Sequence, residues 1–150
     1  MSNKWDKRFM ELAQLIASWS KDPSRKVGCV IVDDKRTILA TGYNGFPRGV
    51  DDSIEERFER PQKYEFTEHA ERNAVFSAAR NGVKLEGSTI YVPWFTCVDC
   101  CRAVIQAGIT TMVAEKPDEK QFNDPKWGPG FRTALTMLEE SDVKVRWFKE

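Results

Sequence analysis

Apolar side chains recur at helical spacing at the start of the chain and in three later segments. The first such stretch predicts an amphipathic helix over residues 4–19. Its apolar positions are Trp5, Phe9, Leu12, Ile16 and Trp19. The same spacing predicts helices over residues 69–80, 97–108 and 130–142.

Shorter apolar runs rich in β-branched residues lie between these helices. Two of them flank "DDKR" in "KVGCVIVDDKRTILATGYNG" and predict a β-hairpin, and three more predict strands over residues 88–94, 109–114 and 143–148. A hairpin followed by alternating helices and strands indicates a five-stranded mixed sheet with helices on its faces. We therefore expect a single α/β domain over residues 1–150, built as a three-layer α/β/α sandwich.

A long polar stretch interrupts this alternation. "FPRGVDDSIEERFERPQKYEF" is charged and punctuated by proline, so it predicts an extended loop with at most a short helix. Loops of this length in a compact domain usually carry function or are disordered.

Charge and composition restrict the classes of partner. Lysine plus arginine and aspartate plus glutamate number 23 each, so no overall field attracts nucleic acid or an acidic membrane, and a small ligand fits better. The first residues alternate charged with apolar side chains, which predicts neither a signal peptide nor a spanning helix and indicates a cytoplasmic protein. Cysteines there stay reduced, so a close C-x-x-C pair favours a metal or redox site over a disulfide.

The candidate metal ligands are His69, Cys97 and Cys100. His69 is the only histidine, and Cys29 and Cys101 are expected to be packing residues, so the set stops at three ligands. Catalytic zinc sites use three protein ligands and leave one position for water, whereas structural sites use four. A lone C-x-x-C or H-x-E means little, but both at the starts of predicted helices favour a zinc site.

The predicted helix starts explain how these residues could meet. Cys97 and Cys100 are three residues apart and therefore share one side of a helix, and Thr96 with Asp99 matches a capping box. Two helix starts converge where adjacent parallel strands each lead into a helix. Glu71 can share the site only if the first turn splays outward; there its carboxylate could take a proton from metal-activated water.

The chain resembles the zinc-dependent cytidine deaminase superfamily, whose signature is H-x-E with a later P-C-x-x-C. It resembles the deoxycytidylate (dCMP) deaminases more specifically, through "SKDPSRKVGCVIV", "GYNGFPRGV", "HAERNAVFSAARNG", "GSTIYV" and "CVDCCRAVIQAGI". The family usually has proline before the first cysteine, where this chain has Thr96. The resemblance therefore does not give the shape of the loop before Cys97.

This resemblance implies a cytidine deaminase-like fold, one Zn²⁺ per subunit and hydrolysis of dCMP to dUMP and ammonia. Glu71 would transfer protons to N3 and the departing amine, and Asn44 would contact the sugar, the alternative being that Asn44 is simply a turn residue. Phosphate contacts are expected among basic and hydroxyl side chains that could also be solvated surface groups. They are Lys21, Ser24, Arg25, Lys26 and Arg48.

The resemblance also implies regulation by dCTP and dTTP, with Mg²⁺ accompanying the triphosphate, in a hexamer. The expected effector residues are Gly42, Tyr43, Asn44, Gly45 and Arg48, which the sequence does not separate from substrate residues. Large apolar side chains that we expect at the surface also favour contacts between subunits. They are Trp5, Phe9, Trp19, Phe46 and Pro47.

Two alternatives to a dCMP deaminase remain at this level. A deaminase of cytidine, dCTP, tRNA or another polynucleotide would use the same metal chemistry, but polynucleotide substrates favour a basic surface and this chain has acidic stretches such as "DDSIEERFE". A non-catalytic zinc-stabilised domain would have little use for Glu71 or for an open fourth ligand position.

Overall fold

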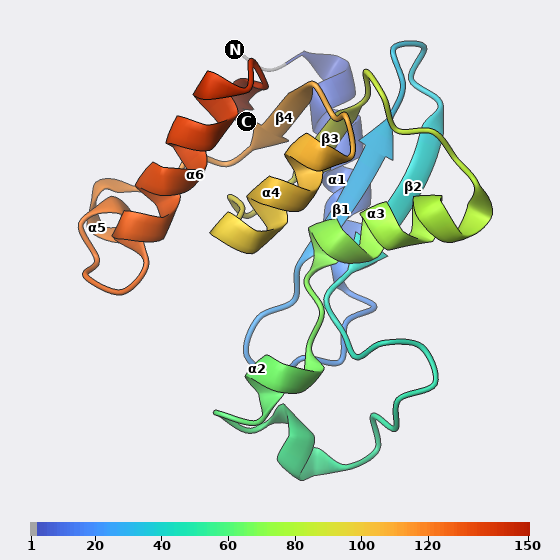
Figure 1. The fold of residues 1–150 in the computed structure, drawn as a ribbon, viewed down its shortest axis with the longest axis vertical. Helices are drawn as coiled ribbons and strands as arrows, with labels where there is room; N and C mark the ends of the chain where they lie inside the picture. The colour runs from blue at the N-terminus through green and yellow to red at the C-terminus, as the bar shows by residue number, and fades with distance from the viewer. Residues whose placement is uncertain (1–2) are drawn as a thin grey trace.

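The computed structural model describes residues 3–150 and contains a five-stranded mixed sheet with helices on both faces (Figure 1). The strands are β1 (Gly28–Val32), β2 (Ile38–Tyr43), β3 (Thr89–Val92), β4 (Thr111–Ala114) and β5 (Lys144–Trp147). The helices are α1 (Lys4–Ala17), α2 (Lys63–Phe66), α3 (Ala70–Asn81), α4 (Val98–Gln106), α5 (Glu119–Phe122) and α6 (Gly128–Glu140), with a 3-10 helix, η1 (Glu55–Phe58). The predicted α/β/α class is confirmed.

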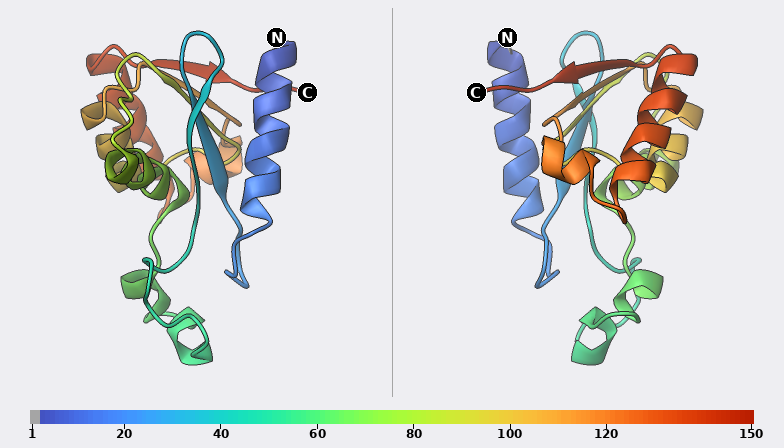
Figure 2. Two further views of the ribbon diagram at one scale, coloured as in Figure 1. Left: turned by 90° about the vertical axis from the view of Figure 1, so that its right-hand side faces the viewer. Right: turned by 90° about the vertical axis from the view of Figure 1, so that its left-hand side faces the viewer.

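The sheet has the order β2-β1-β3-β4-β5. Strand β1 is antiparallel to both of its neighbours, whereas β3, β4 and β5 are parallel. Helix α1 covers one face, and α3, α4 and α6 cover the other (Figure 2). None of the helices among residues 3–150 combines the length and the apolar character needed to span a bilayer.

Successive side chains of β1 point to opposite faces of the sheet and so contribute to both halves of the hydrophobic core. Val30 and Val32 face α1, where Phe9 and Met10 are buried, while Cys29 and Ile31 face the cluster under α3, α4 and α6. All five strand residues are buried, as expected for a strand covered on both faces.

The first helix is shorter than predicted, and the exposure of its large apolar side chains also differs from the prediction. It ends at Ala17, because Ser18, Trp19 and Ser20 form turn hydrogen bonds to the last carbonyls. Trp19 therefore lies outside the helix, half exposed against the edge of Tyr43 at 6.2 Å between ring centroids. The expectation that Phe9 is exposed is wrong, since it packs against Tyr91 at 5.1 Å.

Two glycines allow helices to approach the sheet closely. A Cβ on Gly28 would lie 2.3 Å from the carbonyl oxygen of Ala13 in α1, and one on Gly42 would lie 2.3 Å from that of Ala70 in α3. Because no side chain larger than hydrogen fits at Gly42, this contact sets where the first turn of α3 rests on β2.

Residues 46–66, called the excursion below, project from the end of the sheet where α3 begins (Figure 1). They contain η1 and α2, which is more helix than the sequence predicted. Phe46 stacks on Phe58 and contacts Phe66, with ring centroids at 4.5 and 5.4 Å, so Phe46 packs within the excursion and is not a free surface residue.

A buried carboxylate ties α1 to the sheet. Asp6 is fully buried and accepts a hydrogen bond from the Tyr91 hydroxyl at 2.9 Å. Arg146 on β5 donates to both of its oxygens, at 2.8 and 2.9 Å. Burial, followed by the bond to Asp6, raises the pKa of Tyr91 to about 12, so the tyrosine remains a donor at neutral pH.

We predict that Asp6→Asn lowers the free energy of unfolding by about 1–3 kcal/mol, because the amide lacks the negative charge and one of the two oxygens that accept from Tyr91 and Arg146. Urea unfolding followed by circular dichroism measures the change. Glu11→Gln, on an exposed position of the same helix, is the control and should shift stability by less than about 0.5 kcal/mol. Equal effects of the two substitutions would contradict a stabilising role for Asp6.

Candidate metal centre and the pocket around it

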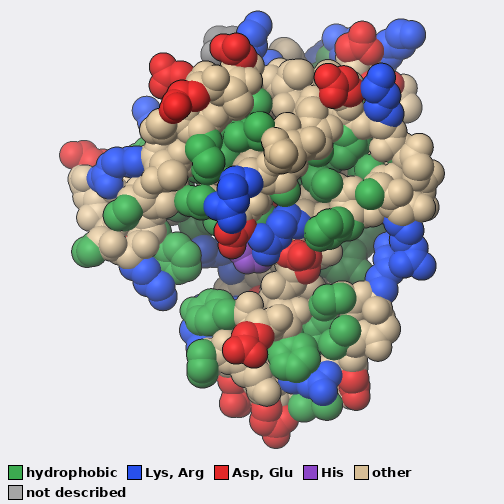
Figure 3. Space-filling model, in the orientation of Figure 1, with side chains coloured by type: hydrophobic (Ala, Val, Ile, Leu, Met, Phe, Trp, Pro, Cys, Tyr) green, Lys and Arg blue, Asp and Glu red, His purple; other side chains and the backbone are tan. Residues whose placement is uncertain are grey.

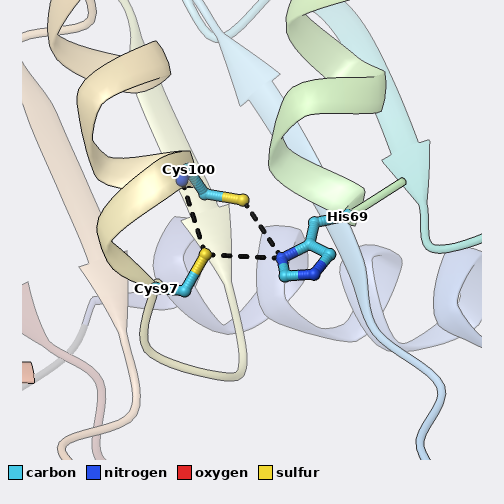
Figure 4. Close-up of side chains that lie close together, drawn as sticks. All are labelled: His69, Cys97 and Cys100. Carbon is cyan, nitrogen blue, oxygen red and sulfur yellow. Dashed lines mark hydrogen bonds between the residues drawn. The ribbon is translucent and has the colours of Figure 1, made fainter. Parts of the chain in front are cut away.

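The three predicted ligands meet where α3 and α4 begin (Figure 4). His69 precedes α3 and Cys97 precedes α4, and both have extended backbone angles, whereas Cys100 lies in the first turn of α4. The Nδ1 atom of His69 lies 3.4 Å from each of the two sulfur atoms. All three ligand atoms lie within 4.8 Å of one another, the only such group among residues 3–150.

These distances fit a tetrahedral zinc ion. Zinc–sulfur bonds of about 2.3 Å and zinc–nitrogen bonds of about 2.0 Å at tetrahedral angles separate nitrogen from sulfur by about 3.5 Å. The observed 3.4 Å lies close to this value. One imidazole and two thiols are also the donor types that zinc prefers. His69, Cys97 and Cys100 could therefore hold zinc with a fourth position left open.

The start of α4 differs from the sequence prediction. Cys97 itself is the N-cap, and its sulfur accepts from the Cys100 amide at 3.4 Å, so the predicted Thr96–Asp99 capping box is wrong. Thr96 is buried and donates to the Cys97 carbonyl, while Asp99 pairs with Arg102 and Arg72. The capping sulfur is thus also the candidate ligand, which fixes its direction.

The strands below the site also differ from expectation. α4 follows β3, but α3 follows β2 through the excursion, and β1 lies between β2 and β3. Since β1 is antiparallel to both, β2 and β3 run in the same direction without being neighbours. The two helix starts therefore converge at one end of the sheet, but the prediction of adjacent parallel strands beneath them is wrong.

Glu71 lies in the first turn of α3 and is buried. Burial raises the pKa of its carboxyl above the ordinary value, and the negative charge of Cys97 adds to this shift. The side chain of Thr96 stabilises the charged carboxylate and partly offsets it. A carboxyl with a raised pKa can both take up and release a proton nearer neutral pH.

The thiols and the imidazole influence one another. Hydrogen bonding from Cys100 lowers the pKa of Cys97 to about 4, and His69 contributes to the same shift. The interaction with Cys97 raises the pKa of His69 in turn. Cys97 is therefore readily available as a thiolate, the form that binds metals.

A pocket of about 640 Å³ opens beside these residues and is lined by His69, Glu71 and Cys97. In Figure 3 the single histidine lies in the hollow between the excursion and the rest of the molecule. A larger cavity of about 830 Å³ lies among α5, α6 and β5, but none of the candidate ligands lines it. The smaller pocket is the candidate active site because it contains the reactive groups.

Three of the predicted substrate residues reach this pocket, namely Ser24, Arg25 and Asn44. Lys26 lines a separate groove beside α1, and neither Lys21 nor Arg48 lines the active-site pocket, so the structure does not place Lys21 with the phosphate-binding candidates. The amide of Asn44 is already used, since its oxygen accepts from Val27 and its nitrogen donates to the Arg25 carbonyl, both at 2.9 Å. Asn44 therefore orders the Arg25 loop, and its contact with a sugar stays a prediction.

The predicted effector residues lie at the end of β2 and at the start of the excursion. Gly42 is buried against α3, which accounts for a glycine at this position without any ligand. Tyr43 and Arg48 are exposed, Gly45 is half-buried, and neither Tyr43 nor Arg48 lines the active-site pocket. Their effector role stays a prediction.

Sequence reasoning missed two walls of the pocket. The excursion contributes Arg60, Lys63 and Tyr64, and the segment around α5 contributes Lys126 and Trp127. Three cation–aromatic pairs border the pocket, with cation-to-centroid distances of 3.9, 5.8 and 4.9 Å. They are Arg25–Trp94, Arg60–Tyr64 and Lys126–Trp127.

One of the missed elements had a recognisable signal. α5 begins with a reciprocal capping box, in which Asp118 accepts from the Gln121 amide and the Gln121 side chain accepts from Asp118. The D-x-x-Q pattern before α5 is visible in the sequence. The position of Lys126 and Trp127 in the same pocket as His69 has no comparable local signal.

Comparisons with known proteins agree with this geometry. The model of the cytidine and deoxycytidylate deaminase zinc-binding region matches residues 3–116. An uncharacterised deaminase in the luxG 3′ region of Aliivibrio fischeri is 41% identical over 147 residues, which cover 98% of this chain and 95% of that protein. A probable deoxycytidylate deaminase of Drosophila melanogaster is 33% identical over 154 residues, which cover 95% and 71%.

The fold is shared with a solved dCMP deaminase from the cyanophage S-TIM5 in complex with dCMP and dUMP. The TM-score is 0.77 at 24% identity, and the match covers 99% of each chain. The zinc-binding-region match includes all three candidate ligands and four of the five strands. On these grounds the chain belongs to the cytidine and deoxycytidylate deaminase family.

Proposed function

We propose that this protein is a dCMP deaminase that hydrolyses dCMP to dUMP and ammonia and so supplies dUMP for dTMP synthesis. The observation that carries the proposal is the close approach of His69, Cys97 and Cys100 to one another beside a pocket that the buried Glu71 lines together with His69 and Cys97. Zinc, when bound, supplies Lewis-acid activation of water near neutral pH. We place the reaction in the cytoplasm.

Glu71 moves the protons in this proposal. Its carboxylate takes a proton as water adds to C4 of the pyrimidine, and it delivers that proton to N3. Glu71 then takes the proton of the hydroxyl group now on C4 and transfers it to the exocyclic amine, so that the bond from C4 to this nitrogen breaks, ammonia leaves and C4 keeps a carbonyl oxygen. Burial suits this role because it brings the pKa of the carboxyl closer to neutrality.

The choice of dCMP rests on the relatives and on the pocket. The Drosophila protein is named a probable deoxycytidylate deaminase, and the phage structure holds dCMP and dUMP. Around the pocket, Arg25, Arg60 and Lys126 offer donors suited to a 5′-phosphate. Ammonia release from dCMP, dCTP, cytidine and single-stranded DNA, assayed side by side, tests the choice, and a preference for any substrate but dCMP would overturn it.

We further propose that the protein forms a hexamer regulated by dCTP as activator and dTTP as inhibitor, with Mg²⁺ bound to the triphosphate. The exposed Trp19, Tyr43 and Phe76 support an interface, because they are large apolar side chains near the edge strand β2. Arg48, exposed at the start of the excursion, could contact a triphosphate.

We predict that zinc binding depends on the three ligands alone. His69→Ala, Cys97→Ala and Cys100→Ala should each lower bound zinc below one equivalent per chain, because two donors hold the ion weakly. Metal analysis of purified protein measures this. Cys101→Ala is the control, since that thiol is buried and points to the Ala134 carbonyl. Loss of zinc in the control, or two zinc ions in the parent, would contradict the site.

We predict that Glu71→Gln retains zinc and fold but loses turnover, because an amide cannot transfer the proton. Removal of a general acid–base group typically lowers the rate by about 10²–10⁴-fold. Initial rates of ammonia release measure the loss, with zinc content determined on the same sample. Turnover within a few-fold of the parent would remove Glu71 from the mechanism.

Regulation is tested by kinetics and light scattering. We predict that dCTP raises and dTTP lowers the affinity for dCMP, with a coupling of about 1–3 kcal/mol, because each stabilises a different assembled state. Arg48→Ala should weaken this response while leaving bound zinc unchanged. A monomer with hyperbolic kinetics that neither triphosphate alters would leave an unregulated deaminase.

A further inference from the structure

A buried ion pair joins the excursion to the rest of the molecule. Lys63, the first residue of α2, donates to Asp22 in the loop between α1 and β1, at 2.9 Å. The two side chains are only 9% and 5% exposed. Both residues line the active-site pocket. Nothing in the proposed chemistry uses either of them.

The Asp22 carboxylate also shapes its own loop. The same oxygen, Oδ1, accepts from the amides of Ser24 at 2.8 Å and Arg25 at 3.2 Å. Burial tends to raise the pKa of Asp22, but the bonds from Lys63 and the two amides outweigh it and lower the pKa. The carboxylate therefore remains charged while it fixes the backbone that carries Arg25 to the pocket.

Lys63 belongs to the opposite wall of the pocket, where it lies between two residues that also line the pocket. Arg60 and Tyr64, on either side of it in the chain, line the pocket, and Arg60 Nε donates to the Tyr64 hydroxyl at 2.7 Å. One buried contact thus connects the segment that carries Arg25 with the segment that carries Arg60 and Tyr64.

A second ion pair joins the same two segments but differs in environment. Lys21 contacts Asp52 at 2.9 Å, and these side chains are 67% and 44% exposed. An exposed pair contributes little because water and salt screen it. A buried pair differs, since removal of one partner leaves the other charged and desolvated. The arrangement of the two walls therefore depends on Asp22 and Lys63.

We propose that Asp22 and Lys63 are positioning residues, which hold the walls of the pocket at the separation that binds the phosphate of the nucleotide. This inference rests on the proposed function. The reacting C4 must lie at His69, so the 5′-phosphate, at the other end of dCMP, lies toward Arg25 and Arg60. The pair acts through these residues and needs no contact with the substrate.

The test compares Lys63→Met with Lys21→Met, which removes the exposed pair between the same segments. For each variant, kcat and KM are measured with dCMP and with deoxycytidine, which lacks the phosphate. We expect Lys63→Met to raise KM for dCMP about tenfold or more, with kcat and the constants for deoxycytidine nearly unchanged, because small misplacements of binding groups are costly. Lys21→Met should stay within about twofold.

Two further variants separate charge from folding. Asp22→Asn keeps an oxygen for the amides of Ser24 and Arg25 but lacks the charge, so it should reproduce the effect of Lys63→Met. Lys63→Arg keeps the charge and should restore most of the dCMP affinity. A merely structural role would instead lower kcat/KM for dCMP and deoxycytidine by the same factor in each variant, and this result would overturn the proposal.

Hydrogen–deuterium exchange gives a readout that requires no turnover. Amides of residues 55–67 should exchange faster in Lys63→Met and Asp22→Asn than in the parent and in Lys21→Met. Unchanged exchange in both variants would overturn the positioning role even if dCMP is the substrate. If the parent does not deaminate dCMP, the proposed function fails, while faster exchange would still support the attachment of the excursion by this pair.

Discussion

The contact between β2 and the first turn of α3 is the constraint on which the site depends. At Gly42 the strand backbone lies against the Ala70 carbonyl, at a spacing that leaves no room for a Cβ. Ala70 stands between His69 and Glu71, so this contact sets the height of both side chains above the sheet. The imidazole then reaches the sulfur atoms of α4, while the carboxyl turns into the buried side of the pocket.

Two buried carboxylates, one in the first turn of α1 and one in the loop that follows it, perform related tasks. Asp6 connects α1 to β3 and β5, and Asp22 connects the α1–β1 loop to the excursion. Each accepts three hydrogen bonds, so its burial leaves no uncompensated charge. Directional contacts of this kind specify one arrangement of the segments, whereas apolar packing tolerates several.

Local sequence spacing was enough to predict the strands and the longer helices, and it singled out the three side chains that the structure brings together as candidate metal ligands. Cys97 and Cys100 are close in the chain, and His69 begins a segment whose helical period is clear, so short-range geometry determines how they point. The helix and strand ranges were correct to within a few residues for the same reason. The sheet order was not accessible, because β1 lies between β2 and β3 through contacts distant in the sequence.

The pocket walls show why contacts between distant segments could not be predicted from the sequence. Lys63 and Asp22 are 41 residues apart, and each alone is an ordinary charged residue in a polar loop. Phe9 differs, because the helical period of α1 already places it on the apolar face, and the contact that buries it is with Tyr91, which is distant in the sequence. At Thr96 the prediction failed locally, because a cysteine sulfur took the capping role usually filled by oxygen.

The pairing of Asp6 with Arg146 has a consequence for how the chain is made. The two residues are 140 positions apart, and β5 is the last strand of the sheet. During synthesis from the N-terminus, α1 leaves the ribosome long before Arg146 exists, so Asp6 lacks its guanidinium partner until β5 is made. The contact of α1 with the sheet is therefore completed only once β5 has been made, after the segments that carry His69, Cys97 and Cys100.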